Sequence, residues 1–332
     1  MFCYEKKEHK KDGHEYIEIT GFDGKIEHLV VPDIIDGIKV EAIGNHAFSG
    51  RSDIVSISLP ETIKTLYGFA FHDCRNLREI SLFDSLDDYY DGVCRQCDNL
   101  ELVEITVNRS WYEVIRNFLA DNDKTLSFLV HTKISEEAGL LENEEKNTVD
   151  NEADYLDSFL TFPEYVYDFN ENTMARTIQF SIAGAGMFYR ECVDRRKIDY
   201  RQYDSLFSKA IIDGSKMAEN IAVARLLYPV ELSDGSRKTY EDFISVNGEN
   251  LLKRLIEQSA NLGQSSWGSC KKLDFLERIL SYRKDDGEGM FLSKVMDAAV
   301  QYASMKGYTT ITAMLMDKTS HQSVVEETGF FF

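Results

Sequence analysis

Residues 40–107 of this chain repeat with a period of 23, and this periodicity limits the possible folds more than any other feature. Positions 23 apart form seven columns of apolar or packable residues in one unbroken register. A unit this short cannot bury its apolar face alone, so such units stack on their neighbours to form a solenoid. The columns are Val40, Ile63 and Leu86; Ile43, Leu66 and Tyr89; Ala47, Ala70 and Val93; Phe48, Phe71 and Cys94; Ile54, Leu77 and Leu100; Ile57, Ile80 and Val103; and Leu59, Leu82 and Ile105.

Each unit contains a short strand with alternating inward and outward positions. The segment Leu77-x-x-Ile80-x-Leu82 has the Leu-x-x-Leu-x-Leu spacing of a leucine-rich repeat. Successive side chains of a strand point to opposite faces, so Ile80 and Leu82 are expected to face inward. The residue between them, Ser81, and its equivalents Ser58 and Glu104 are expected to face outward.

Two segments carry a resemblance to a known family. Residues 40–48, VEAIGNHAF, and residues 66–77, LYGFAFHDCRNL, resemble the BspA-type, or Treponema-type, leucine-rich repeats. The resemblance extends over about residues 15–108 and implies a β-solenoid. The third unit is degenerate, with Val93 and Cys94 in place of Ala-Phe and Phe83 in place of proline, which suits the end of an array.

The pair Cys94 and Cys97 resembles half of a redox or zinc site when it is considered alone. In the repeat register, Cys97 aligns with Cys74, and Cys94 occupies the column of Phe48 and Phe71. We therefore interpret both cysteines as buried structural positions of the repeat.

The chain after the repeats divides into two further segments. Residues 111–130 have helical spacing, and a helix there would cover the open end of the solenoid. Residues 136–157 are acidic and polar and are interpreted as a solvated linker. The helical spacing rests on Trp111, Val114, Ile115, Phe118 and Leu119.

From about residue 158 the sequence indicates helices alone. Helical periodicity is present in 173–190, 200–212, 217–228, 251–258, 273–282, 291–306 and 308–317, with loops expected at 232–238, 259–270 and 284–289. Residues 299–316 resemble the helix-turn-helix of an ankyrin repeat. The predicted fold is α+β with two solenoid-like domains, a short leucine-rich-repeat β-solenoid followed by an all-α, ankyrin-like repeat domain. The predicted domains are 1–110, a capping helix and acidic linker at 111–157, and a helical domain at 158–332.

The net charge of −20 argues against nucleic acid and anionic membranes as partners, because both are polyanions. No run of about 20 apolar residues is present, and the N-terminal lysines are not followed by the apolar core of a signal peptide. We therefore expect a cytoplasmic protein.

No convincing catalytic constellation, cofactor motif or metal site is found in the sequence. The seven histidines are dispersed, with His131 and His321 alone. Gly184 and Gly186 lack the third glycine of a dinucleotide motif and are interpreted as a site of close helix packing. Residues 285–289, DDGEG, are interpreted as a turn, because a calcium loop needs a glutamate where Met296 stands.

The sequence thus favours a non-catalytic protein-interaction or scaffold protein that binds another protein or peptide through the outward strand positions. The alternatives are an enzyme of unrecognised type in the helical half, and a surface adhesion protein whose leader is absent from this chain. The predicted partner-binding residues are Ser56, Ser58, Glu79, Ser81, Phe83, Glu104 and Thr106.

Overall fold

A computed structural model describes residues 1–10, 12–134, 155–172, 177–260 and 267–328. The chain divides into two compact units, residues 1–209 and 210–332, and each is described by itself. The first unit contains β1 (Phe2–Glu8), β2 (Glu15–Phe22), β3 (His28–Val30), β4 (Ile34–Ile35), β5 (Ile38–Ile43), β6 (Ser56–Ser58), β7 (Thr65–Leu66), β8 (Glu79–Phe83), β9 (Asp88–Tyr89), β10 (Leu102–Val107), α1 (Glu113–Asp121), β11 (Leu126–Lys133), β12 (Tyr155–Phe162), β13 (Val166–Asn172), β14 (Thr177–Ala183), α2 (Gly186–Arg190) and α3 (Tyr200–Ser205).

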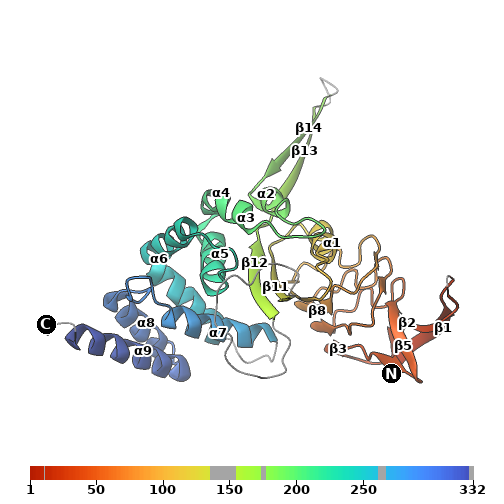
Figure 1. Ribbon diagram of the computed structural model, residues 1–332, viewed down its shortest axis with the longest axis horizontal. Helices are drawn as coiled ribbons and strands as arrows, with labels where there is room; N and C mark the ends of the chain where they lie inside the picture. Colours follow the sequence, from red (N-terminus) through yellow and green to blue (C-terminus); the bar gives the residue numbers. More distant parts are fainter. Residues whose placement is uncertain (11, 135–154, 173–176, 261–266, 329–332) are drawn as a thin grey trace. The chain divides into compact units, whose positions relative to one another are not determined.

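The first unit is built on a β-solenoid with two sheets (Figure 1). One sheet has the order β1-β2-β5-β7-β9, with β4 paired to β5, and the other has the order β12-β11-β10-β8-β6-β3. The repeat strands are parallel, and neighbours pair 23 residues apart: Ile43 with Leu66, and Ile57 with Ile80. The 23-residue period of the sequence is therefore the length of one solenoid turn.

The backbone repeats with the same period as the side chains. Left-handed φ angles occur at His46, Phe69 and Gly92, and again at Gly50, Asp73 and Gln96. Aromatic rings also stack one repeat apart: Phe48 and Phe71 have ring centroids 5.7 Å apart. Nearly all residues of the seven apolar columns are buried, with Ala47 and Tyr89 half-buried. These columns form the core of the solenoid, as the sequence predicts.

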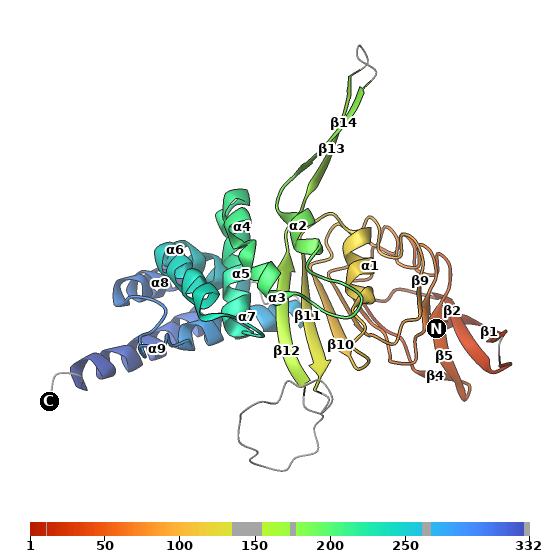
Figure 2. The same cartoon turned by 45° about the horizontal axis from the view of Figure 1, so that its top comes forward.

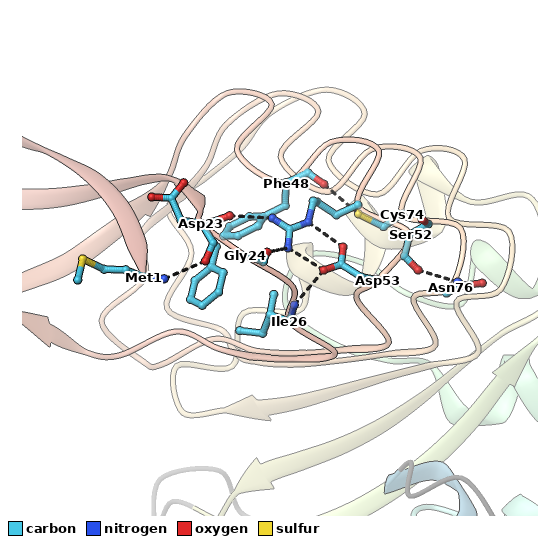
Figure 3. Close-up of polar contacts among 11 residues, drawn as sticks. Met1, Asp23, Gly24, Ile26, Phe48, Ser52, Asp53, Cys74 and Asn76 are labelled. Carbon is cyan, nitrogen blue, oxygen red and sulfur yellow. Dashed lines mark hydrogen bonds and ion pairs between the residues drawn. The ribbon is translucent and has the colours of Figure 1, made fainter.

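A clamp of Arg51 on Asp53 joins the first turn to the rest of the solenoid, and Figure 3 shows the contacts around Asp53. Arg51 donates two hydrogen bonds of 2.7 Å to the carboxylate of Asp53 and others to the carbonyls of Phe22 and Gly24. Asp53 also accepts a 2.9 Å hydrogen bond from the Ile26 amide. The Arg51 guanidinium therefore holds the pKa of the Asp53 carboxyl well below its usual range.

The prediction for residues 111–130 is partly correct. Helix α1 buries Val114, Ile115, Phe118 and Leu119 and covers the end of the first sheet, where Phe118 meets Tyr89 edge to face at 5.5 Å. The helix ends at Asp121, however, and residues 126–133 form β11. The apolar residues of this segment also fit helical spacing, which led to the incorrect prediction. In the structure they form a strand that pairs with β10 of the second sheet.

The prediction that strands stop near residue 158 is wrong. β12 pairs antiparallel with β11, and β13 and β14 form a separate hairpin (Figure 2). The helix expected at 173–190 is replaced by β14 and the short α2, because Gly184 has a φ of 99° and interrupts any helix. The boundary between units lies at 209/210 rather than 157/158, and most of the expected linker lies outside the described residues.

The second unit consists of helices in its described part. α4 (Phe207–Asp213) leads into it, followed by α5 (Ser215–Leu227), α6 (Asp234–Ala260), α7 (Trp267–Ser281), α8 (Ser293–Met305) and α9 (Thr309–Thr328). The predicted 217–228 and 291–306 helices match α5 and α8 closely. The predicted 273–282 helix lies mostly within α7, but α7 begins at Trp267, inside the loop expected at 259–270. The helix expected at 200–212 is interrupted at Leu206, between α3 and α4, and the loop expected at 232–238 is instead the start of α6.

Helix α6 organises this unit because it packs against α5, α7 and α8. This single helix has 27 residues, whereas an ankyrin unit forms two helices and a turn from roughly 33 residues, so α6 is too long to be one helix of such a unit. An ankyrin-like repeat is therefore not confirmed among the described helices. None of those helices is both long and apolar enough to cross a membrane.

Candidate interaction surface

The second sheet of the solenoid aligns the predicted partner-binding residues in rows. Along β6, β8 and β10, successive side chains point alternately to the core and to the outside. Ile57, Ile80 and Val103 occupy equivalent positions and are buried together. The outward residues between them fall in register, because each strand pairs with the next one 23 residues on. We call these outward residues the strand face.

The strand face consists of three rows. The first contains His28, Ser56 and Glu79; the second contains Val30, Ser58, Ser81 and Glu104; and the third contains Phe83, Thr106, His131 and Asp157. All seven predicted residues therefore belong to one face of one sheet. Six of them are half-buried and Glu79 is buried, with 8% of its surface exposed.

The structure adds residues that the repeat register did not reveal. β3 pairs with β6 at an offset of 28 residues, which brings His28 beside Ser56 with a 2.8 Å contact between Nδ1 and the hydroxyl. Val30 on the same strand is 63% exposed. No repeat signal in the sequence marks β3 or β11, because they pair with their neighbours at offsets of 28 and 25 residues and lie outside the strict 23-residue period.

His131 is not alone, contrary to the expectation from sequence. Its Nε2 atom lies 2.9 Å from the Glu104 carboxylate on β10, and its Nδ1 atom lies 2.7 Å from Asp157 on β12. The hydrogen bond to Glu104, reinforced by Asp157, raises the pKa of His131 despite partial burial. The His131 ring joins three strands, and both of its nitrogens have carboxylate partners, which does not favour a role in proton transfer.

The structure supports the structural interpretation of the Cys94 and Cys97 pair. The thiol of Cys97 donates to the carbonyl of Phe71 at 3.1 Å, as the thiol of Cys74 donates to Phe48 one repeat earlier. Cys94 is buried, and burial raises the pKa of its thiol well above the usual value. A thiol in this state is a poor nucleophile, because the thiolate is the reactive form.

Two glycine-containing motifs also behave as structural elements. A Cβ atom at Gly186 would lie 2.4 Å from the carbonyl oxygen of Pro163, so this glycine permits the close packing of α2 that the sequence suggested. In residues 285–289, Gly287 has a φ of 82° and Asp286 accepts the Glu288 amide at 2.9 Å, which is the predicted turn. Residues 261–266, in the expected 259–270 loop, lie outside the described residues.

The expectation that the histidines are dispersed is also wrong for His9 and His14. His9 and His14, which flank the turn between β1 and β2, have stacked rings with centroids 5.1 Å apart. Asp12 lies between them. The antiparallel register of the hairpin places Glu8 opposite Glu15, so the two ends of the turn must meet.

The family model of the BspA type leucine rich repeat region matches residues 23–135 in six copies. This part of the chain is a BspA-type leucine-rich repeat region. The match extends through β11, whereas the sequence prediction ended the array near residue 110. A search of curated proteins found no match.

The BspA-type region is also similar to solved leucine-rich repeat proteins. A leucine-rich repeat protein from Bacteroides ovatus is 14% identical, with a TM-score of 0.19, and the alignment covers 32% of this chain and 48% of that one. A leucine rich cell surface protein from Faecalibacterium prausnitzii is 17% identical, with a TM-score of 0.24, covering 32% and 36%. The leucine-rich repeat protein of T. pallidum is 21% identical, with a TM-score of 0.21, covering 30% and 68%. The chain thus spans about half or less of the first two proteins.

Proposed function

We propose that this protein is a non-catalytic interaction protein that binds another protein or peptide through the strand face. The observation that carries the proposal is the register of the outward side chains, which extends in three rows over neighbouring strands of one sheet. Solenoids present such extended surfaces because each turn adds one more copy of the same outward positions.

The composition of the strand face indicates the kind of partner. Small hydroxyl side chains, Ser56, Ser58 and Ser81, provide hydrogen-bonding groups with little steric bulk. Glu104 and Asp157 add negative charge, and Phe83 supplies one aromatic side chain at the C-terminal end of β8. A polar or basic segment with one apolar anchor would complement this surface, and the net charge of −20 would speed its association.

The proposal is tested by crosslinking mass spectrometry of the full chain in its native cell. We expect crosslinks from partner proteins to concentrate beside the strand face. Two substitutions, Ser58→Arg and Ser81→Arg, place cations and bulk on the middle row, and each should reduce partner recovery at least about tenfold, the change that 1.4 kcal/mol of binding free energy produces.

The matched control is Ser52→Arg, because Ser52 is an exposed serine in the turn before β6 and lies off the strand face. Circular dichroism should show that all three variants retain the wild-type fold. The proposal fails if the strand-face variants and the control recover the same partners in the same amounts, or if the crosslinks fall elsewhere on the chain.

A further inference from the structure

The turn between β1 and β2 gathers three potential metal ligands on the first unit of the protein. The Asp12 Oδ1 atom lies 3.2 Å from His9 Nδ1 and 2.8 Å from His14 Nδ1. The three ligand atoms all lie within 4.8 Å of one another. Two imidazole nitrogens and one carboxylate oxygen that converge in this way form a common ligand set for zinc and related metals.

The hydrogen bond between His14 and Glu41 determines which nitrogen of His14 can act as a ligand. The Nε2 atom of His14 lies 2.9 Å from the Glu41 carboxylate on β5. A carboxylate only accepts, so Nε2 carries a proton and donates it to Glu41. In the neutral imidazole the lone pair is then on Nδ1, which faces Asp12.

That arrangement brings electron-rich atoms together at the centre of the turn. The Nδ1 atom of His14, with its lone pair, lies 2.8 Å from Oδ1 of Asp12. The Nδ1 atom of His9 lies 3.2 Å from the same oxygen. Electron-rich atoms approach this closely only when a hydrogen-bonding proton or a metal cation lies between them. The bridging group is therefore either a proton, on His14 or on Asp12, or a metal cation.

The distances suit a metal after small adjustments. Ligands about 2.0 to 2.1 Å from a tetrahedral zinc lie about 3.3 Å from one another. The contact of His9 with Asp12 already has this length, and the contact of His14 with Asp12 needs to lengthen by about 0.5 Å. The two imidazole rings must also separate from their stacked position, which exposed turn side chains are able to do.

We propose that His9, Asp12 and His14 bind a divalent transition-metal ion such as Zn²⁺, with Glu41 positioning His14 through its Nε2–H. Water would complete the coordination sphere, because the three ligands come from one exposed turn. Since Glu41 belongs to β5, the bound ion would connect the N-terminal hairpin to the first repeat strand. A carboxylate that orients a ligating histidine is a frequent feature of metal sites.

Isothermal titration calorimetry with Zn²⁺ on the full, untagged chain tests the proposal. We expect one equivalent of Zn²⁺ to bind the wild type and to be lost in His14→Gln and Asp12→Asn. Glu41→Gln should keep the site but weaken it about tenfold, the low end for loss of such a partner. His46→Asn is the matched control, because His46 is an exposed histidine of the same unit that lies outside both this turn and the strand face, and the Zn²⁺ affinity of this variant should equal that of the wild type.

Absorption spectroscopy with Co²⁺ separates this site from the cysteines. Imidazole and carboxylate ligands give visible bands alone, whereas thiolates add an intense near-ultraviolet band. The proposal is overturned if the wild type binds no Zn²⁺, if His14→Gln binds as the wild type does, or if a thiolate band accounts for all bound Co²⁺. Each of these results is independent of the strand face, so it leaves the proposed interaction function unaffected.

Discussion

Replacing Asp84 is expected to destabilise the first unit strongly, because this carboxylate organises the turn after β10. Asp84 is buried, with 1% of its surface exposed. Its two oxygens accept the backbone amides of Asn108, Arg109 and Trp111 at 2.9, 2.7 and 3.3 Å. The Nε–H group of Arg109 in turn donates a 3.0 Å hydrogen bond to the Asp84 carbonyl.

The Asp84→Ala substitution leaves all three amides without their acceptor. Each unsatisfied buried amide costs about 1 to 3 kcal/mol, and the lower value applies here because water reaches part of this turn. The expected loss in the free energy of unfolding is therefore about 3 kcal/mol. With a urea slope of about 2 to 3 kcal/mol/M, the midpoint of unfolding should fall by about 1 to 1.5 M. Asp84→Asn keeps one carbonyl oxygen and should lie between Asp84→Ala and the wild type.

The turn supplies its own optical probe, because Trp111 is one of the two tryptophans in the chain. With Trp267→Phe as the background, the fluorescence of Trp111 follows unfolding of the first unit during a urea titration. The matched control is Asp87→Ala: Asp87 is 61% exposed and makes one 3.4 Å contact with Arg109, so its loss should cost less than about 0.5 kcal/mol. The reasoning is refuted if Asp84→Ala unfolds within about 1 kcal/mol of the control.

Three further changes test other contacts of the first unit. His131 has a raised pKa in the folded state, so its stabilising contribution is fully present below about pH 6.5 and disappears as the pH rises through the folded value; His131→Gln should remove this part of the pH dependence in urea titrations between pH 6 and 9. Gly186→Ala forces a Cβ against the Pro163 carbonyl and should lower the thermal midpoint by several degrees in calorimetry, whereas an unchanged midpoint would mean that α2 shifts freely. Asp53→Asn weakens the Arg51 clamp, and hydrogen-exchange mass spectrometry should show faster exchange in residues 22–31 but not in residues 102–107.

The repeat region was predictable because its pattern of apolar residues is local and recurs in each turn. Ile57, Ile80 and Val103 occupy the same strand position in three successive turns, so each of them independently predicts that this position is buried. The structure buries all three. The register also explained Cys94 and Cys97 correctly, because a position shared with Phe71 or Cys74 has the same buried surroundings. Repetition thus compensates for the weakness of any single segment.

The errors occurred where the period ends. β11 has apolar residues that fit helical spacing as well as strand alternation, and pairing with β10 decides between the two. β12 and β14 likewise depend on partners that sequence periodicity does not reveal. In the second unit, the start of α6 at Asp234 replaced an expected loop, because polar residues begin a helix whose apolar contacts lie further along it.

The sequence by itself determined the solenoid, its 23-residue turn and the outward positions of β6, β8 and β10. These follow from alternation and stacking, which depend on neighbours at fixed spacing. Only the tertiary structure brought His131 between Glu104 and Asp157, and His14 between Asp12 and Glu41. Such contacts join residues up to 27 positions apart through strand pairing at irregular offsets, so no spacing in the sequence specifies them.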